Sequence, residues 1–407
     1  MKLLFINYIA LPIPPVNGGA VENLVDMFLQ YNEEHHFHDI TVISIYNHEA
    51  EKIAKSYKYC KFIYIKLDKL SDKFNRIIKY MINRVPFFHV GNAYISKTKN
   101  ILKKQDDYKK YDAIIIENAP EFGLILRKIF SGRLILHLHN DYLNKNTKLH
   151  KKILDCYDEV YTISNFLKKC VSTIYQHEKI QTLYNGIDLE RFNKSLYDSN
   201  LIKKSYNVSE NDFVILFCGR VVPEKGVKEL LTAYSMIENK KNTKLVVVGS
   251  AKYGETVHDS YYNDLLKISQ PFSQNIIFTG FIPYSDIPPL YSIADVGVIP
   301  SLINDAFNLT TVEFMANSVP VIVSDWGAMS EVINADNNNI NDNNADNNDC
   351  GIVAYSGNNF EKNIREAIEK LIKNKDMFMD MKKNAYKKSK FYSKEKYCER
   401  FNYLLER

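Results

Sequence analysis

The chain has 407 residues, 45% of them hydrophobic and 25% charged, and it includes 28 Tyr and 22 Phe. This composition excludes a globally disordered protein, and the length exceeds what one hydrophobic core usually supports, so about two domains are expected. The formal net charge of +5 is small for a chain of this size, so any strong electrostatic field must be local.

The apolar start "MKLLFINYIALPIPPVNGG" is interpreted as a first β-strand that ends in a Pro/Gly turn. A signal peptide is disfavoured because no small-residue cleavage site follows. No apolar run approaches the roughly 18 residues that a membrane-spanning helix needs. The sequence therefore predicts a cytoplasmic protein that is at most peripheral on the inner face of the membrane.

Positive charge gathers in one basic region, residues 52–110. From Glu51 to Lys110 there are 16 Lys and Arg against 5 Asp and Glu. A solvated helical face explains this charge as well as contact with an anionic membrane does, where each basic residue near the lipid contributes about 1 kcal/mol. Nucleic acid is not expected as a partner, because no binding motif accompanies the region.

Short β-branched runs recur along the whole chain and are separated by helical patterns such as residues 19–32 and 226–240. The predicted strands cover residues 2–8, 39–45, 62–67, 112–118, 133–139, 159–164, 180–186, 212–219, 243–249, 275–280, 295–300, 319–325 and 351–355. Buried apolar strands alternating with helices indicate parallel βαβ units. The predicted fold class is α/β, with two Rossmann-like doubly wound sheets that face a central cleft.

Three further stretches complete the predicted organisation. Apolar continuity is lost over residues 187–210, which places the seam between the two halves there. Residues 334–349 are rich in Asn and Asp and are interpreted as a disordered insertion, with a metal site as the less favoured alternative. The chain closes with a helix for which Ser393 is the expected N-cap.

The cysteines show neither metal-ligand nor redox-motif spacing, so reduced thiols in a cytosolic protein are expected. They are Cys60, Cys156, Cys170, Cys218, Cys350 and Cys398.

Candidate ligand-binding residues follow the predicted strands, where ligands of doubly wound sheets bind. Gly18 and Gly19 precede a helix, and glycines there allow a phosphate to approach the free N–H groups of the helix, although a turn needing positive φ explains them equally well. Arg220 and Lys225 follow another strand and precede a helix near Gly226. Two cations at a helix N-terminus suit a diphosphate, with surface solvation as the alternative.

Two carboxylates flank the start of a predicted helix near Leu309 or Thr310. Asp305 is expected in the preceding loop and Glu313 in the first turn. The backbone N–H groups between them can meet an anion, while each carboxylate accepts hydrogen bonds from hydroxyls. The pattern therefore predicts a sugar nucleotide as ligand.

These motifs together resemble the retaining glycosyltransferases of family 4, which have the GT-B architecture and include bacterial cell-surface polysaccharide enzymes. The resemblance rests on "LYNGIDLERF", "CGRVVPEKG", "FTGFIPYSDIPPLYSIADVGVIPS" and the Asp305–Glu313 stretch followed by "FMANSVPVIVSDWGAMSEVI", in that order. The segments "NGGAVENLV" and "HLHND" add weaker support. The resemblance implies an acceptor-side domain over residues 1–190, a nucleotide-sugar domain over 191–390, and a terminal helix, 391–407, that returns to the first domain.

The resemblance also implies residue roles. Arg220 and Lys225 would hold the donor diphosphate. Asp305 would contact the donor sugar, and Glu313 would bind the ribose hydroxyls. His139 would line the sugar pocket. The neighbouring His137 is expected to point to the opposite face of its strand and to be structural.

The remaining donor-binding positions implied by the resemblance are Gly18, Gly19, Asn308, Leu309 and Thr310. The family usually has Glu where Asp305 stands and Gly where Asn308 stands. Asn308 is expected to be tolerated because Asn adopts left-handed backbone geometry more readily than most residues.

The implied reaction is transfer of a sugar from a nucleotide-diphosphate donor to a glycan or lipid-linked acceptor in capsule or other polysaccharide synthesis. Uridine is the commonest donor base in the family, so a UDP-sugar is the expected donor. Front-face attack with retention needs no metal, no cofactor and no protein nucleophile. Two alternatives stay open at this point: a non-catalytic sugar-nucleotide-binding subunit of another glycosyltransferase, and a nucleotide-sugar epimerase.

Overall fold

The computed structural model describes residues 1–7, 11–16, 18–67, 93–104, 107–174, 178–252, 254–334 and 350–407. Residues 68–92 of the basic region and residues 335–349 of the Asn/Asp-rich segment lie outside the described residues. The chain forms two compact units, which are described separately: unit 1 contains Met1–Gly186 and Tyr397–Arg407, and unit 2 contains Ile187–Lys396.

Unit 1 is built on a seven-stranded parallel sheet with the order β3-β2-β1-β4-β5-β6-β7. The strands are β1 (Lys2–Ile6), β2 (Asp39–Ile45), β3 (Cys60–Ile65), β4 (Ala113–Glu117), β5 (Arg133–Leu138), β6 (Glu159–Thr162) and β7 (Ile180–Thr182). The helices are α1 (Ala20–His35), α2 (His48–Ala54), α4 (Ala93–Lys104), α5 (Gly123–Leu126), α6 (His150–Leu154), α7 (Asn165–Ser172) and α16 (Lys394–Glu406).

Unit 2 is built on a six-stranded parallel sheet with the order β10-β9-β8-β11-β12-β13. The strands are β8 (Phe213–Cys218), β9 (Thr243–Val248), β10 (Ile276–Gly280), β11 (Val296–Ile299), β12 (Val321–Ser324) and β13 (Gly351–Ala354). The helices are α8 (Ser199–Ser205), α9 (Val227–Ser235), α10 (Ser260–Ser269), α11 (Pro288–Ser292), α12 (Leu309–Ala316), α13 (Met329–Asn334), α14 (Phe360–Lys373) and α15 (Lys375–Ser389).

Both sheets reverse their strand order next to their first strand. In unit 1 the chain moves outward from β1 to β2 and β3, then returns to β4 on the other side of β1. In unit 2 the same reversal separates β9 and β10 from β11 on either side of β8. Ligands of open α/β sheets bind at such switch points, beyond the carboxyl ends of the strands. Ligand sites are therefore expected at the ends of β1 and β4 and at the ends of β8 and β11.

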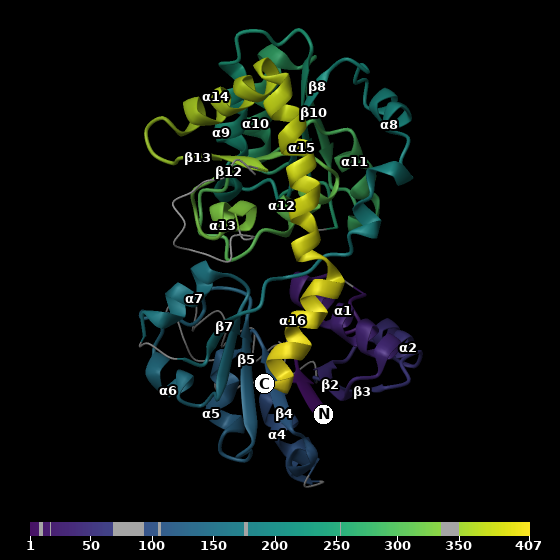
Figure 1. Ribbon diagram of the computed structural model, residues 1–407, viewed down its shortest axis with the longest axis vertical. Coiled ribbons are helices and arrows are strands. Elements are labelled where there is room, and N and C mark those ends of the chain that lie inside the picture. The colour runs from purple at the N-terminus through teal and green to yellow at the C-terminus, as the bar shows by residue number, and fades with distance from the viewer. Residues whose placement is uncertain are drawn as a thin grey trace. The chain divides into compact units, whose positions relative to one another are not determined.

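The terminal helix α16 packs into the core of unit 1 beside α1, as Figure 1 shows in yellow and purple. The Phe401 ring lies 4.6 Å from the Phe28 ring and 6.0 Å from the Phe5 ring, measured between ring centroids. Ser393 caps this helix by accepting a 3.2 Å hydrogen bond from the Lys396 N–H group, which confirms the predicted N-cap. The last segment of the chain thus completes a core that the first 186 residues begin.

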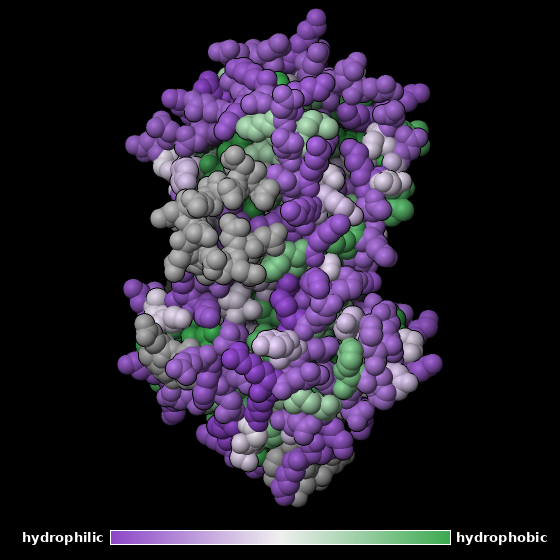
Figure 2. Space-filling model, viewed as in Figure 1, coloured by the Kyte–Doolittle hydropathy of each residue, from purple (hydrophilic) through white to green (hydrophobic). Residues whose placement is uncertain are grey.

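The surface of the visible face is largely hydrophilic, with small apolar areas between the hydrophilic residues (Figure 2). Among the residues that the structure describes, no helix combines the length and the apolar character that crossing a bilayer would require.

Candidate functional site

The strongest contact at the switch point of unit 2 joins Lys225 to Asp305. Lys225 ends the short 3₁₀ turn Pro223–Lys225 that follows β8, and Asp305 lies in the loop after β11. The Lys225 Nζ donates to both carboxylate oxygens of Asp305, at 2.9 and 2.7 Å. The two side chains keep 18% and 17% exposure. Water and a ligand can therefore reach this ion pair.

Close backbone packing fixes the turn that carries Lys225. Gly226 has φ of 72°, and a Cβ at this position would lie 1.8 Å from the carbonyl oxygen of Pro300. The Leu302 N–H donates to the carbonyl of Glu224 at 2.9 Å. Only glycine fits at residue 226, and the loop after β8 is thereby held against the loop after β11.

Arg220 lies two residues beyond the end of β8, at the same carboxyl edge as Lys225. Its side chain is exposed. The backbone of this segment is anchored by the Val221 N–H group, which donates to the carbonyl of Ser250 at 3.0 Å. Arg220 thus has a fixed backbone and a solvated guanidinium.

Asn308 is the N-cap of α12, which begins at Leu309 as predicted. Its Oδ1 accepts from the Thr311 N–H at 3.1 Å, and its Nδ2 donates to Asp305 at 3.2 Å. Its φ is −105°, so the tolerance of Asn for left-handed geometry is not what accommodates Asn308 here. Asn is suited to this position because its side chain caps the helix and holds Asp305 at the same time. The first N–H groups of α12, at Leu309 and Thr310, have no partner within the helix.

Glu313 lies in the second turn of α12 rather than the predicted first turn, since the helix starts at Leu309. It is 4% exposed, and both carboxylate oxygens accept from tyrosine hydroxyls: Tyr284 at 2.9 Å and Tyr291 at 2.6 Å. Burial raises the pKa of Glu313, although the two hydrogen bonds act against it. Arg191 lies over the Tyr284 ring, 4.2 Å from its centroid. Glu313 is therefore a fully hydrogen-bonded, buried acceptor, separate from the ion pair of Asp305.

Gly18 and Gly19 follow β1 in unit 1, with φ values of 73° and 108°. Gly19 is the N-cap of α1, and a Cβ there would lie 2.2 Å from Oε2 of Glu22 and 2.7 Å from Cδ1 of Leu11. The positive φ values and the crowding at Gly19 explain why both positions carry glycine. Glu22, in the first turn of α1, is 5% exposed, and burial raises the pKa of its carboxyl.

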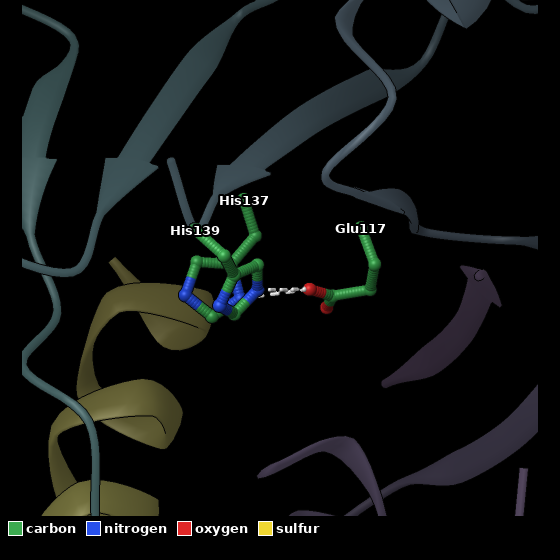
Figure 3. Close-up of side chains that lie close together, drawn as sticks. All are labelled: Glu117, His137 and His139. Carbon is green, nitrogen blue, oxygen red and sulfur yellow. Dashed lines mark hydrogen bonds and ion pairs between the residues drawn. The ribbon is translucent and has the colours of Figure 1, made fainter. Parts of the chain in front are cut away.

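At the ends of β4 and β5 the side chains of Glu117, His137 and His139 converge (Figure 3). Glu117 and His137 are register partners across the two strands. The Oε2 of Glu117 lies 2.8 Å from Nε2 of His139 and 3.0 Å from Nδ1 of His137. The three side chains are 0%, 5% and 0% exposed for Glu117, His139 and His137. They form a buried cluster within hydrogen-bonding distance of a single carboxylate oxygen.

The expectation that His137 and His139 point to opposite faces is therefore wrong. Side chains alternate with a period of two along a strand, so residues two apart share a face, and the expectation contradicted that rule. His139 directly follows β5, which ends at Leu138, and its N–H group donates to Oδ1 of Asn118 at 3.1 Å. Its ring lies on the same side as the His137 ring, 4.1 Å away between centroids.

Sequence reasoning missed Glu117, Tyr284 and Tyr291. Glu117 is the penultimate residue of the predicted strand 112–118 and could have been noticed as a carboxylate near the carboxyl edge, on a strand that precedes the one with the two histidines. The tyrosines carry no such signal, because their role depends on the packing of α12 against the segment that contains α11. Both tyrosines lie in the stretch 278–301, but no spacing pattern there marks them as partners of Glu313.

Comparison with known proteins identifies the family of this chain. The family model of glycosyl transferases group 1 matches residues 198–388, and that of glycosyltransferase family 4 matches residues 36–191. The chain belongs to the family-4-like glycosyltransferases. Its two parallel-sheet units make the fold GT-B, which confirms the predicted fold class.

Relatives of this glycosyltransferase include YtcC of Bacillus subtilis, 26% identical over 399 residues, which cover 95% of this chain and 87% of that protein. The capsular polysaccharide biosynthesis glycosyltransferase CapM of Staphylococcus aureus is 29% identical over 238 residues, 56% of each chain. Among solved structures, HepE of Anabaena in complex with UDP superposes with a TM-score of 0.73 at 17% identity, with 100% of both chains covered. At this identity the similarity to HepE shows a shared fold.

Proposed function

We propose that this glycosyltransferase moves a sugar from a UDP-sugar donor to a glycan or lipid-linked acceptor, with retention of the anomeric configuration, in cell-surface polysaccharide synthesis. The observation that carries the proposal is the Lys225–Asp305 ion pair at the switch point of unit 2. A partly exposed ammonium beside the N-terminus of α12 suits a diphosphate. The match to HepE, a protein solved with UDP, favours uridine as the base.

In the donor complex the Lys225 ammonium turns from Asp305 to the diphosphate, and Arg220 contributes a second positive charge. The free N–H groups at Leu309 and Thr310 face the same anion. Glu313 accepts hydrogen bonds from the ribose hydroxyls in place of one tyrosine. Asp305, released from Lys225, accepts from a hydroxyl of the donor sugar. Unit 2 is the donor domain and unit 1 the acceptor domain in this proposal.

Transfer then breaks the bond between the anomeric carbon and the diphosphate oxygen. The acceptor oxygen bonds to the same face of that carbon, and its proton passes to the departing phosphate oxygen. Lys225 and Arg220 stabilise the negative charge that develops on the leaving diphosphate, which is the electrostatic contribution that enzymes place at such groups. For unit 1 we propose the roles that the family resemblance implies: Gly18 and Gly19 leave room for a phosphate, and His139 contacts a sugar hydroxyl.

The basic region, residues 52–110, is proposed to bring the acceptor domain to an anionic membrane from the cytoplasmic side. Names of relatives such as CapM support a role near cell-surface polysaccharide. Flotation with vesicles of phosphatidylglycerol tests this part. Salt-sensitive binding to these vesicles, and none to neutral phosphatidylcholine vesicles, is expected; equal flotation with both would contradict it.

The main test uses purified protein with a panel of nucleotide sugars. A donor raises the melting temperature, and transfer to an added acceptor follows. Lys225→Ala should lower transfer about 1,000-fold, because it removes the charge opposite the leaving group. Lys228→Ala, an exposed lysine on the same segment, is the matched control and should be unaffected.

Three outcomes of this test speak against the proposal. Near-normal transfer by Lys225→Ala would remove its central residue. Donor binding without transfer would favour a non-catalytic subunit. A changed sugar nucleotide formed without any acceptor would identify an epimerase.

A further inference from the structure

Glu117 contributes an anionic group that has no contact with water. It is 0% exposed, and a buried carboxylate requires hydrogen-bond donors or positive charge beside it. A ring nitrogen of each histidine lies within 3.0 Å of its Oε2. Burial acts to raise the pKa of Glu117, but the charge and hydrogen bonds of His137 and His139 outweigh it and hold that pKa well below its usual range. Glu117 is therefore ionised at neutral pH.

His139 is the neutral member of the cluster. Burial and the neighbouring His137 lower the pKa of His139 to about 4, against the opposing effect of Glu117. A neutral imidazole carries one proton, and the Nε2 of His139 lies 2.8 Å from the Glu117 carboxylate. An ionised carboxylate can only accept, so the proton must lie on Nε2. The Nδ1 of His139 is then a lone pair that can accept from a hydroxyl.

His137 supports Glu117 from within the sheet. Its Nδ1 lies 3.0 Å from the same carboxylate oxygen, and its ring lies 5.7 Å from the Phe401 ring of α16, between centroids. Within the described part of the chain, both ring nitrogens of His137 and the Oε1 of Glu117 are buried without a well-aligned hydrogen-bond partner. Unpaired polar atoms in a core cost stability, so their presence next to a ligand-binding edge indicates a functional constraint.

We propose that Glu117 is a positioning residue that fixes the Nε2–H tautomer of His139 and so presents Nδ1 as a hydrogen-bond acceptor to a sugar hydroxyl at the carboxyl edge of the unit 1 sheet. This inference rests on the proposed function, since it deepens the role given there to His139. A carboxylate that orients a histidine in this way commonly controls its activity, because replacement by an amide selects the other tautomer.

The three side chains could instead bind a transition metal ion, which also prefers two imidazoles and a carboxylate. The Nε2 of His139 and the carboxylate of Glu117 meet the geometry of a direct hydrogen bond, which requires a proton between them. A metal ion would require lone pairs on both atoms. The two arrangements therefore exclude each other, and a bound metal is one outcome of the test.

Glu117→Gln tests the proposal because the amide keeps the size of the side chain and can donate to Nε2 of His139. Protein labelled with ¹⁵N in its histidines reports each tautomer by NMR, and His139→Asn and His137→Asn assign the signals. We expect an Nε2–H tautomer in the wild-type protein and an Nδ1–H tautomer in Glu117→Gln. We also expect sugar transfer to fall at least about 100-fold while the donor Kd stays within about threefold.

Glu49→Gln is the matched control, because Glu49 also lies beside a histidine, His48, at 4.0 Å, but both side chains are exposed. It should change neither the His139 signals nor the transfer rate. An unchanged tautomer or unchanged transfer in Glu117→Gln would overturn the proposal. So would a stoichiometric transition metal in the purified protein whose removal by a chelator changes the signals of His137 and His139.

The two proposals can fail separately. If the wild-type protein transfers no sugar from any donor of the panel, the proposed function fails. The tautomer of His139 and its change in Glu117→Gln need no substrate, so they still decide whether Glu117 sets the protonation of that ring.

Discussion

Each sheet has a cluster of ionisable side chains at its switch point, and the two clusters differ in their exposure to water. In unit 2 the Lys225–Asp305 pair is partly exposed, whereas in unit 1 Glu117 and His137 are completely buried. An ion pair near solvent contributes about 0–1 kcal/mol, so its members exchange partners at little cost. Breaking a buried pair costs about 3–5 kcal/mol, because the remaining charge is left without compensation. The first arrangement suits a place where a ligand replaces an internal partner, and the second suits a fixed geometry.

The largest expected effect is a loss of stability when the buried carboxylate of Glu117 is removed. Glu117→Ala should lower the free energy of local unfolding of unit 1 by about 3–5 kcal/mol. Asp305→Ala should lower that of unit 2 by no more than about 1 kcal/mol. Hydrogen exchange of the amides of β4 and β5, and of β8 and β11, measures the two units separately. Equal losses in both units would show that burial does not distinguish the two groups.

Glu313 is the next group to test, because it is buried like Glu117 but is expected to bind the donor. Glu313→Gln keeps one acceptor oxygen and loses the charge, so UDP should bind about 10-fold to 100-fold more weakly. Calorimetry of UDP binding measures the change. Glu331→Gln, another glutamate of unit 2 in the first turn of α13, is the control. Unchanged UDP affinity in Glu313→Gln would exclude a contact between this carboxylate and the ribose.

The pH dependence of stability tests the burial of Glu313 independently of the ligand. Burial raises the pKa of Glu313 above its ordinary value of 4.5, so the folded protein holds this proton more tightly than the unfolded chain does. The stability that Glu313 contributes is then complete below pH 4.5 and is lost as the pH rises through the raised pKa. Glu313→Gln should gain thermal stability relative to the wild-type protein between pH 4.5 and pH 8. A constant difference over this range would contradict the raised pKa.

The smallest expected effect concerns Asp305. Asp305→Asn frees the Lys225 ammonium from its internal partner, so UDP should bind up to about fivefold more tightly, which corresponds to about 1 kcal/mol. Sugar transfer should fall in the same variant, because the carboxylate contact to the donor sugar is lost. Asp264→Asn removes the exposed pair with Lys267, 2.9 Å long, and serves as the control. Weaker UDP binding by Asp305→Asn would mean that the ion pair orders the site rather than competing with the ligand.

The sequence was sufficient to predict the fold, because the strands are buried on both faces and therefore appear as continuous β-branched runs. Every predicted strand has a counterpart among β1 to β13. The terminal helix was predictable from Ser393 and the pattern after it. Local signals of this kind need only neighbouring residues.

The site was less predictable, because its contacts join residues that are distant in the chain. Lys225 and Asp305 are 80 residues apart, and their ion pair follows from the adjacency of β8 and β11. The meeting of Glu117 with His137 depends on the register of β4 and β5. The two departures from the family pattern, Asp305 and Asn308, contact each other at 3.2 Å, which no single-position argument could anticipate.

The binding of UDP and UMP to the wild-type protein and to Lys225→Ala tests the central claim most directly. If Lys225 holds the diphosphate, the substitution should weaken UDP binding at least about 10-fold and UMP binding by less than about threefold, since UMP lacks the second phosphate. Equal affinities of the two proteins for UDP would contradict the account.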